Sequence, residues 1–275
     1  MMVRASDALW KEGGGYYSET EDQLRASPIL PNSKRLCDRR IMRLFDTYVN
    51  WAERPTILEI GCGRSPWLAY LARRQNCTVI GIDVEPFAAR LAQANLTGAG
   101  ANGEVLCRDA FDLQENQDLF RRFDFIYSWG VMEHFDDAER RAAILANYLR
   151  PGGRILTLVP NLQGLNSLMQ RFADRERYDM HVIYNTDKLR HIHEIAGFKT
   201  IASGYVGFCD GYLSASQPHT PPLRRRIHDR LCWILGMSSE AWNRTLGKAF
   251  APEMRWLAPH VFYIGERLQP VNSAK

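Results

Sequence analysis

The sequence predicts an α/β fold, with a doubly wound, mostly parallel sheet that carries helices on both faces. Short β-branched runs alternate with amphipathic helical stretches from about residue 33 to residue 206, which is typical of βαβ units. One of these runs ends in a glycine turn, Gly61-Cys62-Gly63, that leads directly into a helix. The length of 275 residues is enough for one large domain of this class or two small ones.

The individual elements follow from hydrophobic periodicity and from capping residues. Strands are expected at 56–60, 78–83, 104–107, 123–128, 154–159, 200–206 and 260–266. Helices are expected from about residue 33 to 49, after Ser65, and near 86–96, 112–121, 137–149 and 186–196. The first helix is expected to have Asn32 or Ser33 as its N-cap. The second helix is expected to have Ser65 as its N-cap and Pro66 as its first residue. The helix at 186–196 is expected to end at Gly197 as its C-cap.

Composition excludes several classes of function. The 35 basic and 31 acidic residues nearly balance, so nucleic acid is not expected as the main partner. The six cysteines are scattered without a C-x-x-C pair, which is typical neither of a zinc site nor of a disulfide scaffold. The first 15 residues lack the apolar core of a signal peptide, and no run of about 18 apolar residues occurs. We therefore expect a cytoplasmic chain with no transmembrane span.

Changes in composition predict four segments. Residues 1–35, rich in glycine and tyrosine, form an N-terminal arm or lid; residues 36–208 form the core; and residues 259–275 form the last core strand and a tail. Residues 209–258 read as an insertion that supplies a substrate or lid segment. This insertion is locally basic, so it could receive an anionic acceptor, lie on an anionic membrane surface through Leu223 to Leu235, or simply form a solvated charged face.

The glycine turn predicts a nucleotide-type ligand, because absent side chains let the backbone approach a ligand closely. A dinucleotide fingerprint would place a third glycine where this chain has Pro66, so NAD is disfavoured. Asp83 ends the following strand, the position from which an acidic side chain bonds ribose hydroxyls in this architecture. Asp83 would suit NAD or another nucleotide-type ligand, so it does not distinguish between them.

Four motifs in order lead to a family: an E-x-G-x-G turn, an acidic strand end, an acidic–alanine pair and a P-G-G turn. They are Glu59 to Gly63, Asp83, Asp109-Ala110 and Pro151-Gly152-Gly153. Over about residues 36 to 206 the chain resembles the class I S-adenosylmethionine-dependent methyltransferases. The resemblance implies a Rossmann-like, seven-stranded sheet whose last strand, His260 to Glu266, runs antiparallel.

The resemblance also implies roles in binding S-adenosylmethionine. Gly61 and Gly63 would pass under its methionine moiety, and Asp83 would bond its ribose. Asp109 and the Ala110 amide would contact adenine, while Ser128 and Trp129 would flank the sulfonium. Glu59 would contact the cofactor or bond local backbone amides, and both alternatives stand.

The segment after the fourth strand carries the candidate catalytic residues. Glu133 and His134 look like the V-x-E-H-x segment of many small-molecule methyltransferases, and they could serve as base and orienting group or bind a metal. Metal-dependent relatives place a carboxylate where this chain has Gly130, so no metal is expected. His181 is the second candidate base, and for each histidine a purely structural role remains the alternative.

These features predict an S-adenosylmethionine-dependent methyltransferase that acts on a small-molecule acceptor. O-methylation of a metabolite, a lipid-like molecule or a sugar is the expected reaction, with positioning as the main catalytic device. The alternatives are an NAD-linked reductase on a similar sheet and a non-catalytic protein that binds the cofactor as a scaffold. The sequence does not indicate an oligomeric state.

Overall fold

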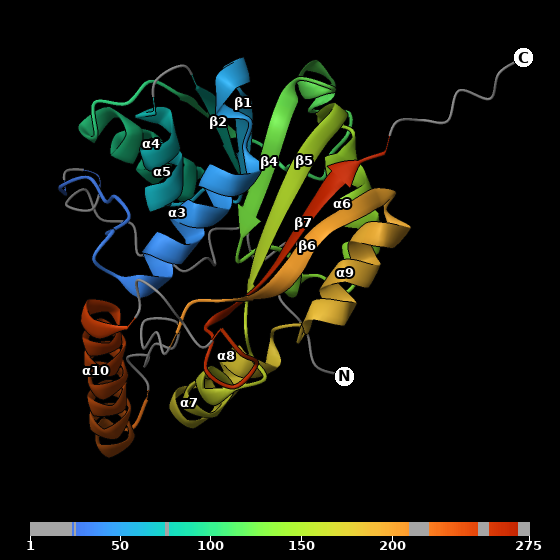
Figure 1. Cartoon of the computed structure of the whole chain (residues 1–275). Helices are drawn as coiled ribbons and strands as arrows, with labels where there is room; N and C mark the ends of the chain where they lie inside the picture. The colour runs from blue at the N-terminus through green and yellow to red at the C-terminus, as the bar shows by residue number, and fades with distance from the viewer. Residues whose placement is uncertain (1–23, 25, 75–76, 209–219, 247–252, 269–275) are drawn as a thin grey trace, which may run out of the picture.

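Seven strands pair into one sheet in the computed structural model, in the order β3-β2-β1-β4-β5-β7-β6 (Figure 1). The strands are β1 (Thr56–Ile60), β2 (Thr78–Asp83), β3 (Glu104–Cys107), β4 (Phe123–Trp129), β5 (Leu149–Pro160), β6 (Phe198–Val206) and β7 (His260–Arg267). The structure describes residues 24, 26–74, 77–208, 220–246 and 253–268. Most of the predicted N-terminal arm, parts of the insertion and the C-terminal tail lie outside these residues.

The strand directions confirm the predicted Rossmann-like α/β fold. The ladders that join β3, β2, β1, β4 and β5 are parallel, whereas β7 pairs antiparallel with both β5 and β6. All seven predicted strands are present. Because the carboxyl ends of parallel strands meet at one edge, the residues that follow β1, β2, β3 and β4 gather there.

Helices cover both faces of the sheet (Figure 1). One face carries α3 (Leu36–Tyr48), α4 (Pro66–Ala72) and α5 (Pro86–Gly98), and the other carries α6 (Ala138–Ala146) and α9 (Thr186–Ile195). Each face has its own apolar core. Phe45, Trp67 and Tyr127 pack on the first face, and Leu145, Leu189 and Tyr263 pack on the second. Two buried cores hold the sheet in place on both sides.

The predicted capping at Ser65 is confirmed. Its hydroxyl accepts a hydrogen bond from the Trp67 amide at 3.0 Å, and Pro66 is the first residue of α4. The expected cap of the first helix was wrong, because α3 begins at Leu36 behind Arg35, which makes no side-chain capping bond. Asn32 instead shapes the preceding turn, where its side chain accepts from the Lys34 amide at 3.0 Å.

The helix predicted near 112–121 was also wrong, since the segment contains only a short 3₁₀ turn at Gln117–Leu119. Side chains form hydrogen bonds with the backbone amides and carbonyls of this segment. Asp112 accepts hydrogen bonds from the amides of Gln114 and Glu115, and the Asn116 amide group donates to the carbonyls of Asp109 and Asp112. These bonds compete with helical ones, so the periodicity of the segment did not become a helix.

Three helices lie outside the predicted set: α7 (Leu165–Ala173), α8 (Arg175–Asp179) and α10 (Pro222–Thr245). Helices α7 and α8 follow β5 and lie below the sheet in Figure 1, and α10 occupies most of the described part of the insertion. Among the described residues, no helix is both long enough and apolar enough to span a bilayer.

Stability depends on the core that lies on the two faces of the sheet. We expect Leu58→Ala to lower the free energy of unfolding by about 2–5 kcal/mol, because Leu58 is fully buried in β1. Leu168→Ala removes the same atoms from an exposed position on α7 and should change the free energy of unfolding by no more than about 0.5 kcal/mol. Urea unfolding of both variants tests this, and equal losses would contradict the assignment of the core.

Candidate functional site

A cavity of about 310 Å³ lies at the carboxyl ends of β1, β4 and β5. Six of the predicted site residues line it: Glu59, Gly61, Trp129, Glu133, His134 and His181. The other residues of its lining are Cys62, Arg64, Ser65, Pro66, Gly130, Pro160, Leu162, Gln170 and Arg177. The structure therefore joins the predicted cofactor turn and the predicted catalytic residues in one space.

The glycine turn leaves no room for a side chain at its first glycine. Gly61 has φ +66°, and a Cβ at this position would stand 2.5 Å from a methyl carbon of Val131. Gly63 also has a positive φ, of 35°. The Gly61 amide donates to the Ile82 carbonyl at 2.8 Å, which ties the turn to the end of β2. Bare backbone is thus presented at the edge of the cavity, as a ligand that lies across the turn requires.

Asp83 holds the turn from the neighbouring strand. One carboxylate oxygen accepts from the Gly63 amide at 2.8 Å, and the other accepts from the Glu85 amide at 3.0 Å. Burial raises the pKa of Asp83 to about 6. A carboxylate has about four acceptor positions, so two remain for hydroxyl donors. Asp83 therefore fits the expected role toward a ribose, although it does not line the cavity.

Glu59 is buried at the cavity and makes a side-chain contact that the sequence did not reveal. One oxygen accepts a hydrogen bond from the Tyr127 hydroxyl, which also lies 3.1 Å from the Ser65 hydroxyl. The Ser65 side chain and the Leu68 amide also interact with the carboxyl group, but its other oxygen makes no hydrogen bond of good geometry to a described residue. Burial raises the pKa of Glu59 to about 8. An unsatisfied buried carboxyl oxygen beside a cavity is suited to a polar or cationic ligand.

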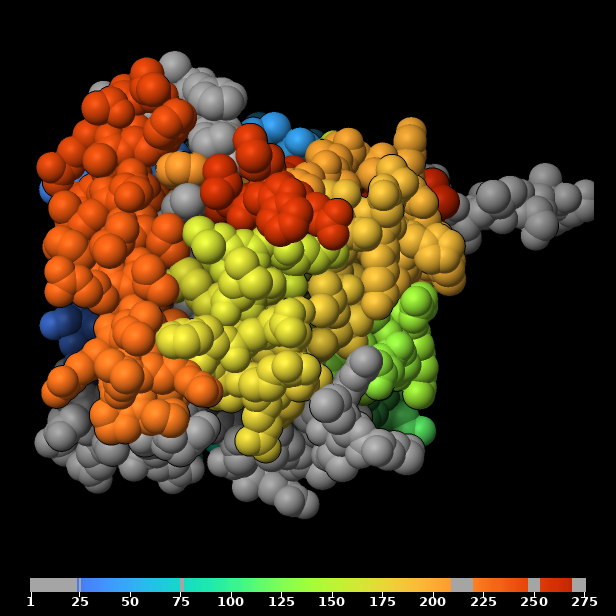
Figure 2. Space-filling view, turned by 90° about the horizontal axis from the view of Figure 1, so that it is seen from below, coloured from blue at the N-terminus to red at the C-terminus, as the bar shows by residue number. Residues whose placement is uncertain are grey.

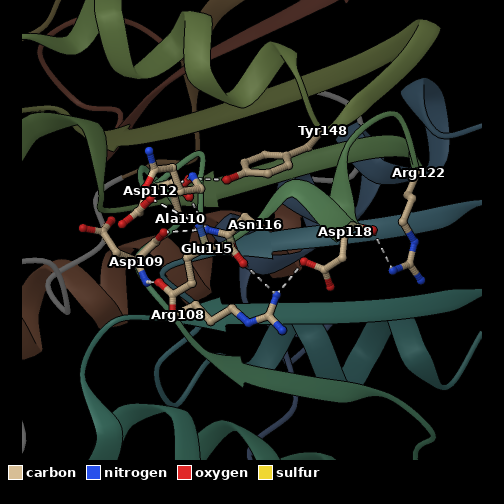
Figure 3. A network of polar contacts seen from close by, with 10 residues as sticks. Arg108, Asp109, Ala110, Asp112, Glu115, Asn116, Asp118, Arg122 and Tyr148 are labelled. Carbon is tan, nitrogen blue, oxygen red and sulfur yellow. Dashed lines mark hydrogen bonds and ion pairs between the residues drawn. The ribbon is translucent and has the colours of Figure 1, made fainter.

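The loop after β3 is held by a network of polar contacts (Figure 3). The Asp109 side chain accepts from the Phe111 amide at 2.9 Å, and the Ala110 carbonyl accepts from the Tyr148 hydroxyl at 2.6 Å. Asn116 fastens the same loop by donating to the Asp109 carbonyl at 2.7 Å. Asp109 and Ala110 thus follow β3 at the same edge as Asp83, in a rigid loop outside the lining of the cavity.

The two residues at the end of β4 lie in different environments. Ser128 is completely buried within the sheet, paired with Ile60 and Thr157 of the adjacent strands. Trp129 lines the cavity. The centroid of its ring lies 5.8 Å from that of the Trp67 ring and 4.8 Å from that of the His260 ring. Of this predicted pair, only Trp129 faces the cavity.

Glu133, His134 and His181 meet although they are far apart in the sequence. Glu133 and His134 lie in the short turn Met132–His134, and the Glu133 carbonyl accepts from the Val182 amide at 2.7 Å, which draws the His181 segment against it. The ring centroids of His134 and His181 are 4.9 Å apart. Each of the three residues offers one atom that could bind a metal ion, and these three atoms lie within 4.8 Å of one another. One Glu133 carboxyl oxygen has no hydrogen-bond partner among the described residues.

Burial favours the uncharged forms of this cluster. It raises the pKa of Glu133 to about 8, lowers that of His134 to about 3, and lowers that of His181. The His181 Nδ1 lies 2.7 Å from the Arg177 carbonyl, which can only accept, so Nδ1 carries the proton and Nε2 keeps a lone pair. The cluster can accept a proton or hold a divalent cation. The expectation that no metal is needed stays a prediction.

Sequence reasoning missed three polar residues of the cavity: Arg64, Gln170 and Arg177. Arg64 directly follows the glycine turn, between Gly63 and the Ser65 cap. Gln170 and Arg177 come from α7 and α8, and the apolar spacing of Leu165, Leu168, Met169 and Phe172 was the signal that could have revealed α7.

Comparison with known proteins gives a consistent assignment. A family model described as a methyltransferase domain matches residues 30–203. Methyltransferase GfsG from Streptomyces halstedii is 27% identical over 169 residues, which are 54% of this chain and 58% of that protein. Trans-aconitate 2-methyltransferase from Deinococcus radiodurans is 34% identical over 111 residues, or 39% of this chain and 40% of that protein. The chain thus spans about half the length of these curated relatives.

Solved structures share the fold. The [4+2]-cyclase SpnF superposes with a TM-score of 0.57 at 15% identity, covering 97% of this chain and 93% of its own. A SAM-dependent methyltransferase from Archaeoglobus fulgidus superposes with a TM-score of 0.52 at 17% identity. The match covers 82% of this chain and 93% of that protein's chain. At these identities the likeness concerns the fold alone.

The close approach at the glycine turn can be tested by adding one methyl group. Gly61→Ala should cost about 2–4 kcal/mol of folding stability, because the new side chain meets Val131 in addition to an unfavourable φ. Gly100→Ala is the matched control, since Gly100 has φ +63° but open space around it, and it should cost only about 1–2 kcal/mol. Equal costs in urea unfolding would show that Gly61 is not sterically constrained.

Proposed function

The chain belongs to the S-adenosylmethionine-dependent methyltransferase superfamily, and we propose that it transfers the methyl group of this cofactor to an oxygen of a small-molecule acceptor. The family assignment confirms the resemblance seen in the sequence and the expected cofactor, S-adenosylmethionine. The NAD-linked reductase gains no support from it. The acceptor, the methylated atom and a cytoplasmic location belong to the proposal.

The observation that carries the proposal is the continuity of the cavity. Its lining includes both Glu59 and Gly61 at the cofactor turn and the cluster of Glu133, His134 and His181. Methyl transfer needs the acceptor atom in line with the bond that breaks, so most of the catalysis can come from alignment. A single cavity that joins the two groups of residues supplies that alignment.

The residues of the chain have distinct tasks in this reaction. The bound cofactor supplies an activated methyl group on a sulfonium. Trp129 packs against the cavity and excludes water, while the unsatisfied oxygen of Glu59 favours positive charge beside it. His181 Nε2 would take the proton of the acceptor hydroxyl, while the bound cofactor would supply the methyl group and keep the electrons of the broken bond on its sulfur.

The cavity favours an acceptor that carries an anionic group. Arg64 and Arg177 are among its lining residues, and arginine is well suited to binding carboxylate or phosphate. Trans-aconitate 2-methyltransferase, one of the curated relatives, is named for an anionic acceptor. We therefore favour an acceptor that carries an anionic carboxylate or phosphate group in addition to the hydroxyl that is methylated, over a neutral metabolite.

Isotope transfer tests the proposed function. Protein incubated with methyl-labelled S-adenosylmethionine and pools of organic acids or phosphates should yield a product heavier by one labelled methyl group, detected by mass spectrometry. His181→Asn should lower turnover about 100-fold and leave the affinity for S-adenosylhomocysteine unchanged, because it removes the proposed proton acceptor from the cavity. His191→Asn, at an exposed position on α9, should behave as wild type.

Binding without any labelled product would support the non-catalytic scaffold instead. Failure to bind S-adenosylhomocysteine in calorimetry would contradict both the methyltransferase and the non-catalytic scaffold. An unchanged turnover in His181→Asn would remove His181 from the mechanism and leave methyl transfer itself standing.

Asp83 should make cofactor affinity depend on pH. Ribose hydroxyls donate more strongly to the ionised carboxylate than to the neutral acid, so binding lowers the pKa of Asp83 and affinity falls as the pH drops through about 6. We expect S-adenosylhomocysteine to bind about 10-fold more weakly at pH 5 than at pH 7.5. Asp83→Asn should bind about 10- to 100-fold more weakly at pH 7.5 and lose the dependence on pH, as measured by calorimetry. A wild-type affinity that is flat between these pH values would refute the contact.

A further inference from the structure

Helix α10 lies at the edge of the molecule, away from the sheet (Figures 1 and 2). It packs on α7 and α3, and Figure 2 shows it in orange beside the yellow α7 and α8 segment. At 24 residues it is about 36 Å long. Its buried side is small, with only His228 and Asn243 fully enclosed. Most of the surface of α10 therefore faces outward.

The outward side of α10 is apolar. Leu223, Ile227, Leu231, Ile234 and Met237 are 43–72% exposed. They recur at intervals of four, four, three and three residues, so they form one stripe along the helix. We call these five residues the α10 stripe. A surface helix of a globular protein normally turns such a stripe toward the core, and an exposed one marks an interaction surface.

The charges beside the stripe are mainly positive. Helix α10 contains five arginines against two acidic residues, Asp229 and Glu240. Arg226, Arg230 and the 63%-exposed Trp233 follow one another at four- and three-residue spacing, so they form a row along one side of the stripe. Basic residues next to exposed leucine, isoleucine and tryptophan are typical of helices that lie in the plane of a membrane surface.

From this arrangement we propose that α10 docks the protein on an anionic lipid surface. The α10 stripe enters the boundary between headgroups and acyl chains, Trp233 lies at the headgroup level, and Arg226 and Arg230 contact the acidic headgroups. Charge complementarity selects this occupant, because the excess of arginine beside the stripe disfavours a second copy of the same basic helix.

Vesicle sedimentation with the full chain tests the docking. The protein should bind vesicles of phosphatidylcholine with phosphatidylglycerol at least 10-fold more tightly than pure phosphatidylcholine, and raising the salt to 0.5 M should weaken that binding. The stripe variant Ile227→Gln with Ile234→Gln should bind at least 10-fold more weakly. Ile195→Gln is the control, because Ile195 on α9 is even more exposed, at 61% against 43% for Ile227 and 44% for Ile234, and it should bind as wild type.

A second variant separates the charge from the apolar contact. Arg226→Gln with Arg230→Gln should abolish the preference for anionic vesicles and keep weak binding to neutral ones. Each variant should retain the wild-type affinity for S-adenosylhomocysteine, which shows that it is folded. The proposal is overturned if the wild type does not bind anionic vesicles, if both double variants bind as tightly as wild type, or if the stripe variant only dissociates a dimer in light scattering.

Discussion

The backbone at Gly61 must pass so close to Val131 that no side chain fits between them, and the site depends on this approach. Val131 belongs to the loop after β4, and Gly61 follows β1, the strand that pairs with β4 in parallel. The register of that pair places Ile60 opposite Ser128, so both strands end at the same level. The turn and the loop that carries Glu133 and His134 therefore share one cavity.

The site also concentrates carboxyl groups in places where burial disfavours their charge. Glu59, Asp83 and Glu133 all have raised pKa values because they are removed from water. Such burial costs stability, and the two apolar cores on the faces of the sheet offset it. A ligand with positive charge near Glu59 and hydroxyl donors near Asp83 would favour the ionised forms of these groups. On this account the energetic cost is recovered when the cofactor binds.

Sequence reasoning identified the parts of the site that depend on local chemistry. Strand periodicity, the glycine turn and the Ser65 cap were all readable, because each rests on residues a few positions apart. The failed helix at 112–121 shows the limit of periodicity, since the side chains of Asp112 and Asn116 replaced helical hydrogen bonds. The approach of His181 to Glu133 could not be read, because α7 and α8 have to fold between them.

The central claim is that one cavity joins the cofactor turn to the Glu133, His134 and His181 cluster. A crystal structure of the protein with S-adenosylhomocysteine tests it most directly. We predict ribose hydroxyls within hydrogen-bond distance of Asp83 and a ligand sulfur that faces the cavity in which His181 lies. A ligand whose sulfur faces away from this cavity, or one bound at another edge of the sheet, would contradict the account.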